Sequence, residues 1–260
     1  MVAVKTLRAN VPQKAHQDFL KEASTMETLS HDNVIKLIGV ITQSEPMAIV
    51  TEFMKYGSLD KYLNKAGKVI KCKQLLQMIL DICEGMKYVS GLGYVHRDLA
   101  ARNILVSETI VCKISDFGLA RSLEDGFTDD INAFKEGKVP IRWTAPEAVL
   151  YRRFSPASDV WSFGIVIWEV FTYGQRPYCD WTNQTVINML ESGYRLPAPD
   201  QCPLGLQNLM LECWSADPTT RPNFKRIADE IASLMMTEPE VLSSDTTMIF
   251  LRILLFIERI

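Results

Sequence analysis

Residues 160–171 read VWSFGIVIWEVF and are apolar on nearly every side of a helix. A helix of that composition belongs inside a large lobe rather than on its surface, and Ser158 or Asp159 can cap its start. The chain has 260 residues, of which 47% are hydrophobic, so it holds enough apolar surface for such a lobe. We therefore expect one large domain or a two-lobed unit.

The first part of the chain has a different pattern. Short β-branched runs at 2–7, 34–41 and 48–53 indicate strands. A helical stretch opened by a proline lies between the first two runs, and its apolar residues recur at helical spacing, with one acidic residue beside them. These positions are Pro12, Phe19, Glu22, Ala23 and Met26.

The pattern turns helical after Gly57. A broad apolar stripe between residues 75 and 86 stops near Gly91 and Gly93, which suit a helix terminus. Strands with one helix first, and helices afterwards, predict an α+β fold with two segregated halves. We assign residues 1–54 to a small N-lobe and 55–236 to a mainly helical C-lobe, with 237–260 as a tail outside the fold.

Charge and cysteine content narrow the function. A net charge of −3 and a pI near 5.7 give no overall electrostatic reason to expect nucleic-acid binding. The six cysteines form no C-x-x-C pair and suit buried thiols in a reducing compartment, so we expect a cytosolic domain. Lys5 and Arg8 interrupt the opening apolar run, so we expect residues 1–8 not to act as a signal peptide. The run at 248–257 is about half the length of a bilayer span.

Four motifs follow one another along the chain. They are VAVK at residues 2–5, HRDLAARN at 96–103, DFG at 116–118 and APE at 145–147, with Glu22 after the first. Any one tripeptide arises often by chance, whereas the ordered set resembles the signature of protein kinases over residues 1–236. The resemblance implies a two-lobed protein kinase fold with a truncated β-rich N-lobe, and transfer of the ATP γ-phosphoryl group.

The resemblance assigns roles to charged residues. Phosphoryl transfer depends on positioning and electrostatics, because negative charge is spread over the oxygens of the moving group. Lys5 would reach the α- and β-phosphates and Glu22 would orient it, the alternative being a surface ion pair. Asn103 and Asp116 offer hard oxygens to Mg²⁺, with Mn²⁺ also possible. Asp98 would accept the proton of the substrate hydroxyl.

The wording of two segments resembles tyrosine kinases in particular. Residues 98–103 read DLAARN, whereas serine/threonine kinases usually carry a lysine two residues after the aspartate. The stretch 138–147 resembles the tyrosine-kinase substrate platform, with Pro140, Arg142 and Trp143 forming it and Pro140 shaping a shelf for a long ring. Arg102 would stand beside the phenol and the incoming phosphate. The implied partners are proteins that carry tyrosine.

The resemblance also implies an adenine site and a set of structural residues. Thr51 would be the gatekeeper, Glu52 to Met54 the hinge, and Ala3 and Leu105 the apolar plates around the base; ordinary strand core is the alternative. The resemblance also implies three structural features. An apolar spine between the lobes consists of Met26, Leu37, His96 and Phe117. Asp159 anchors the catalytic loop, and Arg221 forms an ion pair with Glu147.

Within the tyrosine kinases, the chain is most similar to the ephrin receptors. The segments that carry this likeness read DFLKEAS at 18–24, IVTE at 49–52, GYVHRD at 93–98, IRWTAPE at 141–147 and GYRLP at 193–197. A receptor origin implies a cytoplasmic domain whose parent lies at the plasma membrane. Contact with the membrane would then come only through upstream segments.

Three departures from the family pattern stand out. First, the Gly-rich loop and its two strands do not precede the lysine strand, so we expect an unpaired sheet edge. The alternative function is therefore a catalytically silent interaction module.

Second, the segment 117–146 has no tyrosine whose phosphate could pair with Arg97. Two hypotheses follow: Asp129 and Asp130 supply a standing negative charge, or Thr128 is modified by another kinase. The ending at 249–260 resembles a frayed terminus, with an amphipathic anchor as the alternative.

Overall fold

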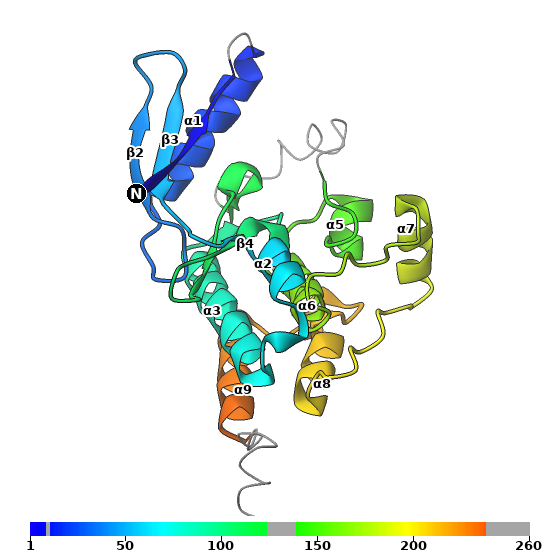
Figure 1. Ribbon diagram of the computed structural model, residues 1–260. Coiled ribbons are helices and arrows are strands. Elements are labelled where there is room, and N and C mark those ends of the chain that lie inside the picture. Colours follow the sequence, from blue (N-terminus) through cyan, green and yellow to red (C-terminus); the bar gives the residue numbers. More distant parts are fainter. Residues whose placement is uncertain (9–10, 124–138, 238–260) are drawn as a thin grey trace, which may run out of the picture.

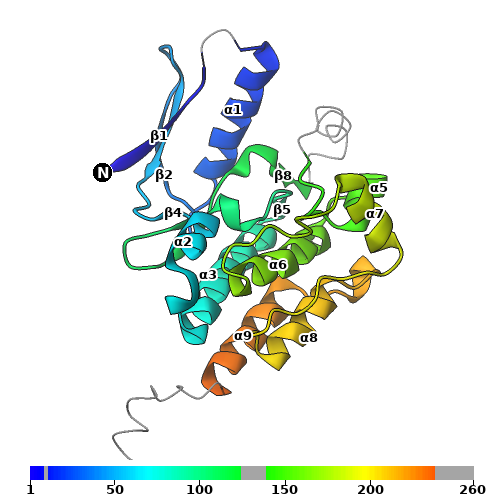
Figure 2. The ribbon, with the colours of Figure 1, turned by 45° about the vertical axis from the view of Figure 1, so that its right-hand side comes forward.

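The computed structural model describes residues 1–8, 11–123 and 139–237. It shows a small β-rich lobe above a larger helical lobe, which confirms the α+β prediction (Figures 1 and 2). The small lobe contains β1 (Val2–Thr6), α1 (Gln13–Glu27), β2 (Leu37–Ile41) and β3 (Ala48–Glu52). The predicted strands are present, although the second begins at Leu37 rather than at residue 34.

The small sheet is antiparallel with the order β1-β3-β2. Ala3 lies opposite Thr51 and Lys5 lies opposite Ile49, so these side chains share the face that is turned toward α1. Val2 and Val4 alternate with them and are 47% and 54% exposed. Among the described strands none pairs with the outer edge of β1, so this edge is unpaired, as predicted.

Helix α1 begins after Pro12, as the sequence indicates. Its predicted stripe of Phe19, Ala23 and Met26 is buried, and Glu22 is buried with it at 6% exposure. The apolar stripe therefore turns Glu22 toward the sheet rather than toward solvent.

Helix α6 (Pro156–Phe171) forms the centre of the large lobe. Every residue from 158 to 171 is buried, which confirms the prediction of an interior helix. The helix begins earlier than predicted, because Ser155 is the N-cap and forms a reciprocal capping box with Ser158. The expected cap at Ser158 or Asp159 is therefore wrong, and Asp159 is left available for another contact.

The remaining helices surround α6 and support its neighbours. Helix α3 packs along α9, and α8 packs against both α6 and α9. Their bounds are α2 Leu59–Ala66, α3 Cys72–Gly91, α5 Pro146–Tyr151, α7 Asn183–Glu191, α8 Leu204–Cys213 and α9 Phe224–Thr237. None of the helices in the described part of the chain is long and apolar enough to cross a membrane.

Short strands in the large lobe were not predicted. They form a three-stranded sheet with the order β4-β6-β7 and a two-stranded sheet of β5 and β8. Their bounds are β4 Gly57–Ser58, β5 Tyr94–Val95, β6 Ile104–Val106, β7 Cys112–Ile114 and β8 Arg121–Ser122. Elements of two or three residues are too short for sequence periodicity to show.

Candidate active site

Lys5 and Glu22 form an ion pair between β1 and α1. Lys5 Nζ lies 2.7 Å from Glu22 Oε1 and 2.8 Å from Oε2. Burial raises the pKa of Glu22, and the charge and hydrogen bond of Lys5 partly oppose that shift. The Lys5 side chain remains 53% exposed. A buried carboxylate therefore holds a lysine that faces an opening, which differs from a pair of exposed surface charges.

Asp116 stands at the same opening. Its carboxylate Oδ1 lies 3.8 Å from Lys5 Nζ, and its side chain is 48% exposed. Its φ of +62° lies in the left-handed region, where non-glycine residues are uncommon and cluster at functional sites. A Cβ at Gly118 would lie 3.3 Å from Asp116 Oδ1 and 3.6 Å from Glu22 Oε2. Glycine at 118 therefore leaves room for the Asp116 carboxylate, whereas the distance to Glu22 would be an ordinary contact.

Residues 96–103 form a loop whose polar groups are tied to one another. Arg102 pairs with Asp98 through Nη2 and Oδ1. The Asn103 amide donates to the Asp98 carbonyl at 2.7 Å, and Ser115 donates to the Asn103 carbonyl through its backbone amide at 2.9 Å and its hydroxyl at 2.7 Å. Because Ser115 precedes Asp116, this chain of bonds fixes the loop relative to the Lys5 opening.

The carboxylate of Asp98 is partly buried. Burial raises its pKa, and the charges of Arg102 and His96 oppose that shift. The Arg102 guanidinium also lies over the Trp143 ring, 4.3 Å from its centroid. Asp98 and the predicted platform residue Trp143 therefore share one neighbour, Arg102.

Two carboxylates of α6 hold this loop from inside the lobe. Asp159, 1% exposed, accepts from the His96 amide at 2.7 Å and the Arg97 amide at 3.0 Å. This confirms its predicted anchoring role, and it stabilises a turn in which Arg97 has a φ of +68°. Glu169 Oε2 accepts from the Ala101 amide at 2.9 Å. Sequence reasoning missed Glu169, although a single acid within the apolar run 160–171 was the available signal.

Packing joins the loop to the small lobe. The rings of His96 and Phe117 meet edge to face with centroids 5.1 Å apart, and both side chains are fully buried. His96 Nε2 also lies 3.1 Å from the Ser115 carbonyl oxygen. Met26 is buried at 3% exposure. His96 thus packs and positions the backbone, as expected.

The predicted adenine site lies along β3 and β6. Thr51 is the cross-strand neighbour of Ala3, and Leu105 is half-buried in β6. Met54 is buried and its carbonyl accepts from the Gly57 amide at 3.1 Å. The Glu52 carboxylate accepts from Lys113 Nζ at 2.8 Å and from the Lys36 amide at 2.8 Å. The Glu52 side chain therefore supports the segment that joins the lobes. Only the backbone of Glu52 is left to bind an adenine base.

The predicted substrate platform begins at the edge of the described chain. The Pro140 carbonyl accepts from the Trp143 amide at 2.9 Å and from the Thr144 hydroxyl at 3.0 Å, which closes a tight turn. Arg142 is 8% exposed, and its guanidinium donates to the carbonyls of residues 177, 178 and 181. Arg142 thus lies beneath the platform and supports it.

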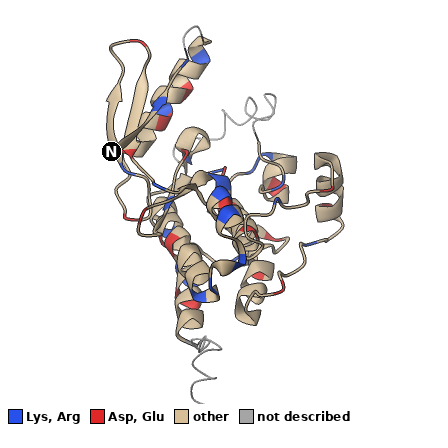
Figure 3. Ribbon diagram, in the orientation of Figure 1, with Lys and Arg blue, Asp and Glu red and all other residues tan. Residues whose placement is uncertain are grey.

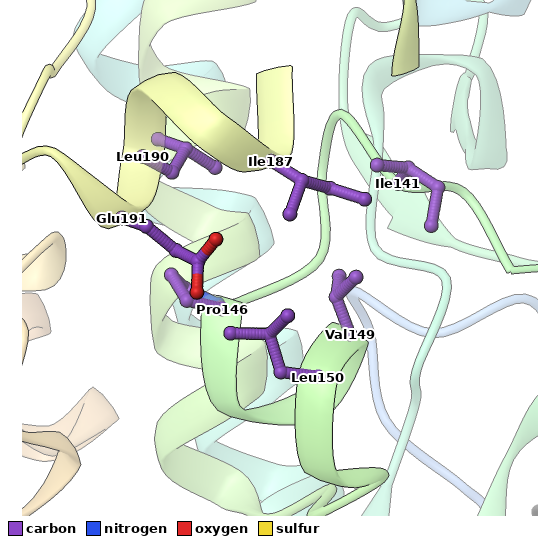
Figure 4. Close-up of a pocket in the computed structure, with 7 residues that line it drawn as sticks. All are labelled: Ile141, Pro146, Val149, Leu150, Ile187, Leu190 and Glu191. Carbon is purple, nitrogen blue, oxygen red and sulfur yellow. The ribbon is translucent and has the colours of Figure 1, made fainter. Parts of the chain in front are cut away.

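A buried ion pair fixes the end of the platform. Arg221 donates to Glu147 through Nη1 at 2.7 Å and Nη2 at 2.9 Å, as predicted. A small apolar pocket lies next to it, between α5, α7 and the platform, with one carboxylate at its side (Figure 4). Its lining residues are Ile141, Pro146, Val149, Leu150, Ile187, Leu190 and Glu191.

Asn103 and Asp116 fit a magnesium ion in chemistry and number. The Asn103 nitrogen donates to Asp98, which leaves its amide oxygen for a cation, and the Asp116 carboxylate is half-exposed. Magnesium takes few protein ligands and completes its shell with phosphates and water. Within the described residues no group of three or more His, Cys, Asp or Glu could hold a metal ion by itself. A site that shares the metal with a bound nucleotide agrees with both facts.

Comparison with known proteins identifies the class. The family model for protein tyrosine and serine/threonine kinases matches residues 1–231, and the chain belongs to this family. The chain is 53% identical to ephrin type-A receptor 5 from Gallus gallus over 234 residues and 53% identical to ephrin type-B receptor 2 from the same species over 235. It is 52% identical to ephrin type-A receptor 4-B from Xenopus laevis over 234 residues.

These matches cover 90% of this chain and 23% to 24% of the three receptors. The chain is thus a kinase domain homologous to those of ephrin receptors, and it spans about a quarter of the length of these relatives. The predictions for Thr128, Asp129, Asp130 and the tail after residue 237 fall outside the described residues.

Proposed function

We propose that this chain is an ATP- and magnesium-dependent kinase that phosphorylates protein tyrosines. The observation that carries the proposal is the proximity of two groups of charged and polar residues. Lys5 pairs with Glu22 and lies near Asp116, and Ser115, which precedes Asp116, donates to the carbonyl of Asn103, whose amide bonds Asp98. This arrangement supplies positioning and electrostatic stabilisation, which phosphoryl transfer requires.

Each side chain has a distinct task in that reaction. Lys5, held by Glu22, would bind nucleotide phosphates, and Asn103 and Asp116 would hold Mg²⁺, which would supply positive charge to the phosphate oxygens. Asp98 accepts a hydrogen bond from the substrate hydroxyl and takes its proton as the hydroxyl oxygen bonds to the γ-phosphorus; the bond from that phosphorus to its bridging oxygen breaks, and ADP leaves. A phenol has a pKa of about 10 and is neutral at physiological pH, so a positioned acceptor is needed.

The surroundings of Asp98 favour tyrosine over serine. Arg102 is held between Asp98 and the Trp143 ring, so a cation lies beside the base and beside a flat apolar surface. A long ring side chain can lie on the turn at Pro140 and still reach Asp98, whereas a serine hydroxyl is close to its own backbone.

The identity to ephrin receptors supports a place in receptor signalling. In this proposal the domain is the cytoplasmic part of a plasma-membrane receptor, and its substrates are proteins with tyrosines near the membrane. Both statements concern the longer parent, of which the chain matches only a part.

A turnover assay tests the proposal. The purified chain is incubated with magnesium ATP and a glutamate–tyrosine copolymer, and phosphotyrosine is measured beside a matched serine copolymer. We expect incorporation into the tyrosine polymer alone, and none with Asp98→Asn. Labelling of serine as fast as tyrosine would overturn the specificity, and equal labelling by Asp98→Asn would overturn the assigned site.

A silent interaction module is the second candidate. The outer edge of β1, which no other described strand pairs, favours it, because an open strand edge can pair with another chain. Thermal unfolding with and without magnesium ATP, taken together with the turnover assay, separates the two. A module that binds nucleotide without turnover would show the thermal shift and no phosphotyrosine.

A further inference from the structure

Lysines recur along α2, the following 3-10 turn η1 (Gly67–Val69) and the start of α3. All of these lysines are exposed, and Asp60 is the only acidic residue in the sequence between residues 59 and 80. Basic segments gather along α2 and the adjoining end of α3 in Figure 3. We call this the lysine surface; it consists of Lys61, Lys65, Lys68, Lys71 and Lys73. The net charge of −3 therefore conceals a strongly basic region.

The protein does little to neutralise this surface. Among the described residues, no ion pair joins Lys61, Lys65, Lys68 or Lys71 to an acid. Several lysines elsewhere are paired, as Lys113 is with Glu52. The Oδ1 atom of Asp60 is buried, so that oxygen is turned away from the solvent in which the lysines lie.

The placement of the lysines also opposes local stability. Lys61 and Lys65 are four residues apart on α2, a spacing at which like charges repel. Lys71 is the N-cap of α3 and Lys73 lies in its first turn, where the helix dipole favours acids and no acid is present. Leu59 and Leu63 already bury the other face of α2. Folding therefore does not account for this concentration of charge.

The chemistry of the surface points to one kind of partner. Its cations are all lysines, which act as point charges and lack the planar fork with which arginine grips single phosphates or carboxylates. Val69 lies in the turn between Lys68 and Lys71 and is 85% exposed. Exposed lysines around an exposed aliphatic side chain suit an extended anionic layer with an apolar interior. We propose that the lysine surface docks on an anionic lipid bilayer.

Vesicle binding tests this proposal with the whole 260-residue chain. Co-sedimentation is measured with phosphatidylcholine vesicles and with vesicles that also contain about 30% phosphatidylserine, a fraction chosen to give a negative leaflet. We expect binding to the anionic vesicles only, and weaker binding as salt shortens the range of electrostatic attraction. Equal binding to both vesicle types would overturn the proposal.

A matched pair of quadruple variants locates the contact. Each lysine near an anionic leaflet strengthens binding by roughly fivefold. Changing Lys61, Lys65, Lys68 and Lys71 to Gln together should therefore weaken vesicle binding by about a hundredfold or more. The control changes Lys14, Lys36, Lys87 and Lys225 to Gln and removes the same charge, and we expect less than about fivefold weakening. Equal losses in both variants would show general charge attraction and overturn the site.

Further measurements test the apolar contact at Val69 and the folding of the variants. Val69→Asp should weaken binding severalfold, because it removes the apolar contact and adds repulsion, and an unchanged affinity would overturn the role of the turn. Thermal unfolding should show that all variants remain folded. Competition by millimolar soluble phosphoserine would indicate recognition of single phosphates, as in a phosphorylated protein, and would count against the bilayer.

Discussion

Helices α1 and α6 both carry carboxylates to the site, but they hold them in different ways. Helix α6 is buried from residue 158 to 171, and its Asp159 and Glu169 bind backbone amides of the catalytic loop. Helix α1 buries one stripe, and its Glu22 binds a single side chain, Lys5. The sheet beside α1 is open, with Val2 and Val4 about half exposed.

The difference separates two kinds of catalytic contribution. Loss of an α6 carboxylate leaves buried amides unpaired, so stability and activity should fall together. Loss of the α1 carboxylate misplaces one cation at the surface of the cleft, so activity should fall with little change in stability. The C-lobe half of the site is thus part of the folded core, whereas the N-lobe half depends on where one amphipathic helix lies.

Asp98→Asn should have the largest effect on turnover. The variant keeps the size of the side chain and removes the proton acceptor, so we expect kcat to fall by about 10³-fold. Because burial raises the pKa of Asp98, the neutral amide should leave stability unchanged or slightly higher. Nucleotide affinity, measured by titration calorimetry, should stay within about twofold, because the metal-binding residue Asn103 bonds to the backbone carbonyl of Asp98, which the variant keeps. A variant that loses ATP binding would contradict this division of roles.

Asp159→Ala should have the largest effect on stability. It removes the acceptor for the amides of His96 and Arg97 in a fully buried site. We expect the free energy of unfolding to fall by about 3–5 kcal/mol, measured with urea, together with loss of activity. As a control, Asp217→Ala removes an exposed carboxylate whose hydrogen bonds go to Thr219, so it should lower the free energy of unfolding far less. Similar losses in both variants would argue against α6 as the anchor.

Glu22→Gln tests the other half of the comparison. It keeps a polar side chain of the same size in α1 but weakens the hold on Lys5, so we expect kcat to fall about 10- to 100-fold through misplacement of that cation. The unfolding free energy should change by less than about 1 kcal/mol, because burial already raises the pKa of Glu22 and opposes its charge. A stability loss as large as that of Asp159→Ala would mean that both helices hold their charges in the same way.

The sequence predicts this comparison only in part. Apolar periodicity predicted the buried stripe of α1, and apolar residues on nearly every side predicted the interior position of α6, because long elements show their pattern over several turns. Motif order predicted one site for Lys5, Glu22, Asp98, Asn103 and Asp116. The structure joins Lys5 to Glu22 and Asp116, and Asp98 to Asn103. Neither signal reports which charges support the backbone.

The missed features depend on contacts distant in sequence. Glu169 meets the Ala101 amide across 68 residues, and no local pattern encodes that distance. The inward position of Arg142 depends on the carbonyls of Tyr178 and Trp181. The true start of α6 depends on Ser155, whose capping role was hidden by two later residues that also suit an N-cap. Short strands such as β4 exist only because β6 lies beside them.

Glu169 should make stability depend on pH. Burial raises its pKa to about 7, from a value near 4.5 in the unfolded chain. At a pH between the two pKa values, the folded state holds a proton on Glu169 that the unfolded state has released. The free energy of unfolding therefore falls as pH rises through this range, by roughly 3 kcal/mol in total. Glu169→Gln should flatten that slope when urea unfolding is compared at pH 5 and pH 8. An unchanged slope would show that Glu169 is ionised in the fold at both pH values.

Tyr88→Phe should have the smallest effect and tests how firmly α1 is attached at its base. The Tyr88 hydroxyl accepts from the Ser30 amide at 2.9 Å, and its ring stacks on His31 with centroids 5.0 Å apart, just beyond the end of α1. Phenylalanine keeps the stack and removes one hydrogen bond, at a cost of about 0.5–1.5 kcal/mol.

If α1 is positioned through this contact, kcat should fall about two- to fivefold while KM for the peptide stays constant, since the loss of a weak tether costs about 1 kcal/mol at most in the transition state. Tyr173→Phe is the matched control, because it removes a hydroxyl bonded to Gln201 at 3.2 Å within the large lobe. It should change stability by a similar amount and leave kcat unaltered. An equal fall in kcat for both variants would mean that α1 does not depend on this loop, and that the N-lobe half of the site is fixed by its own sheet.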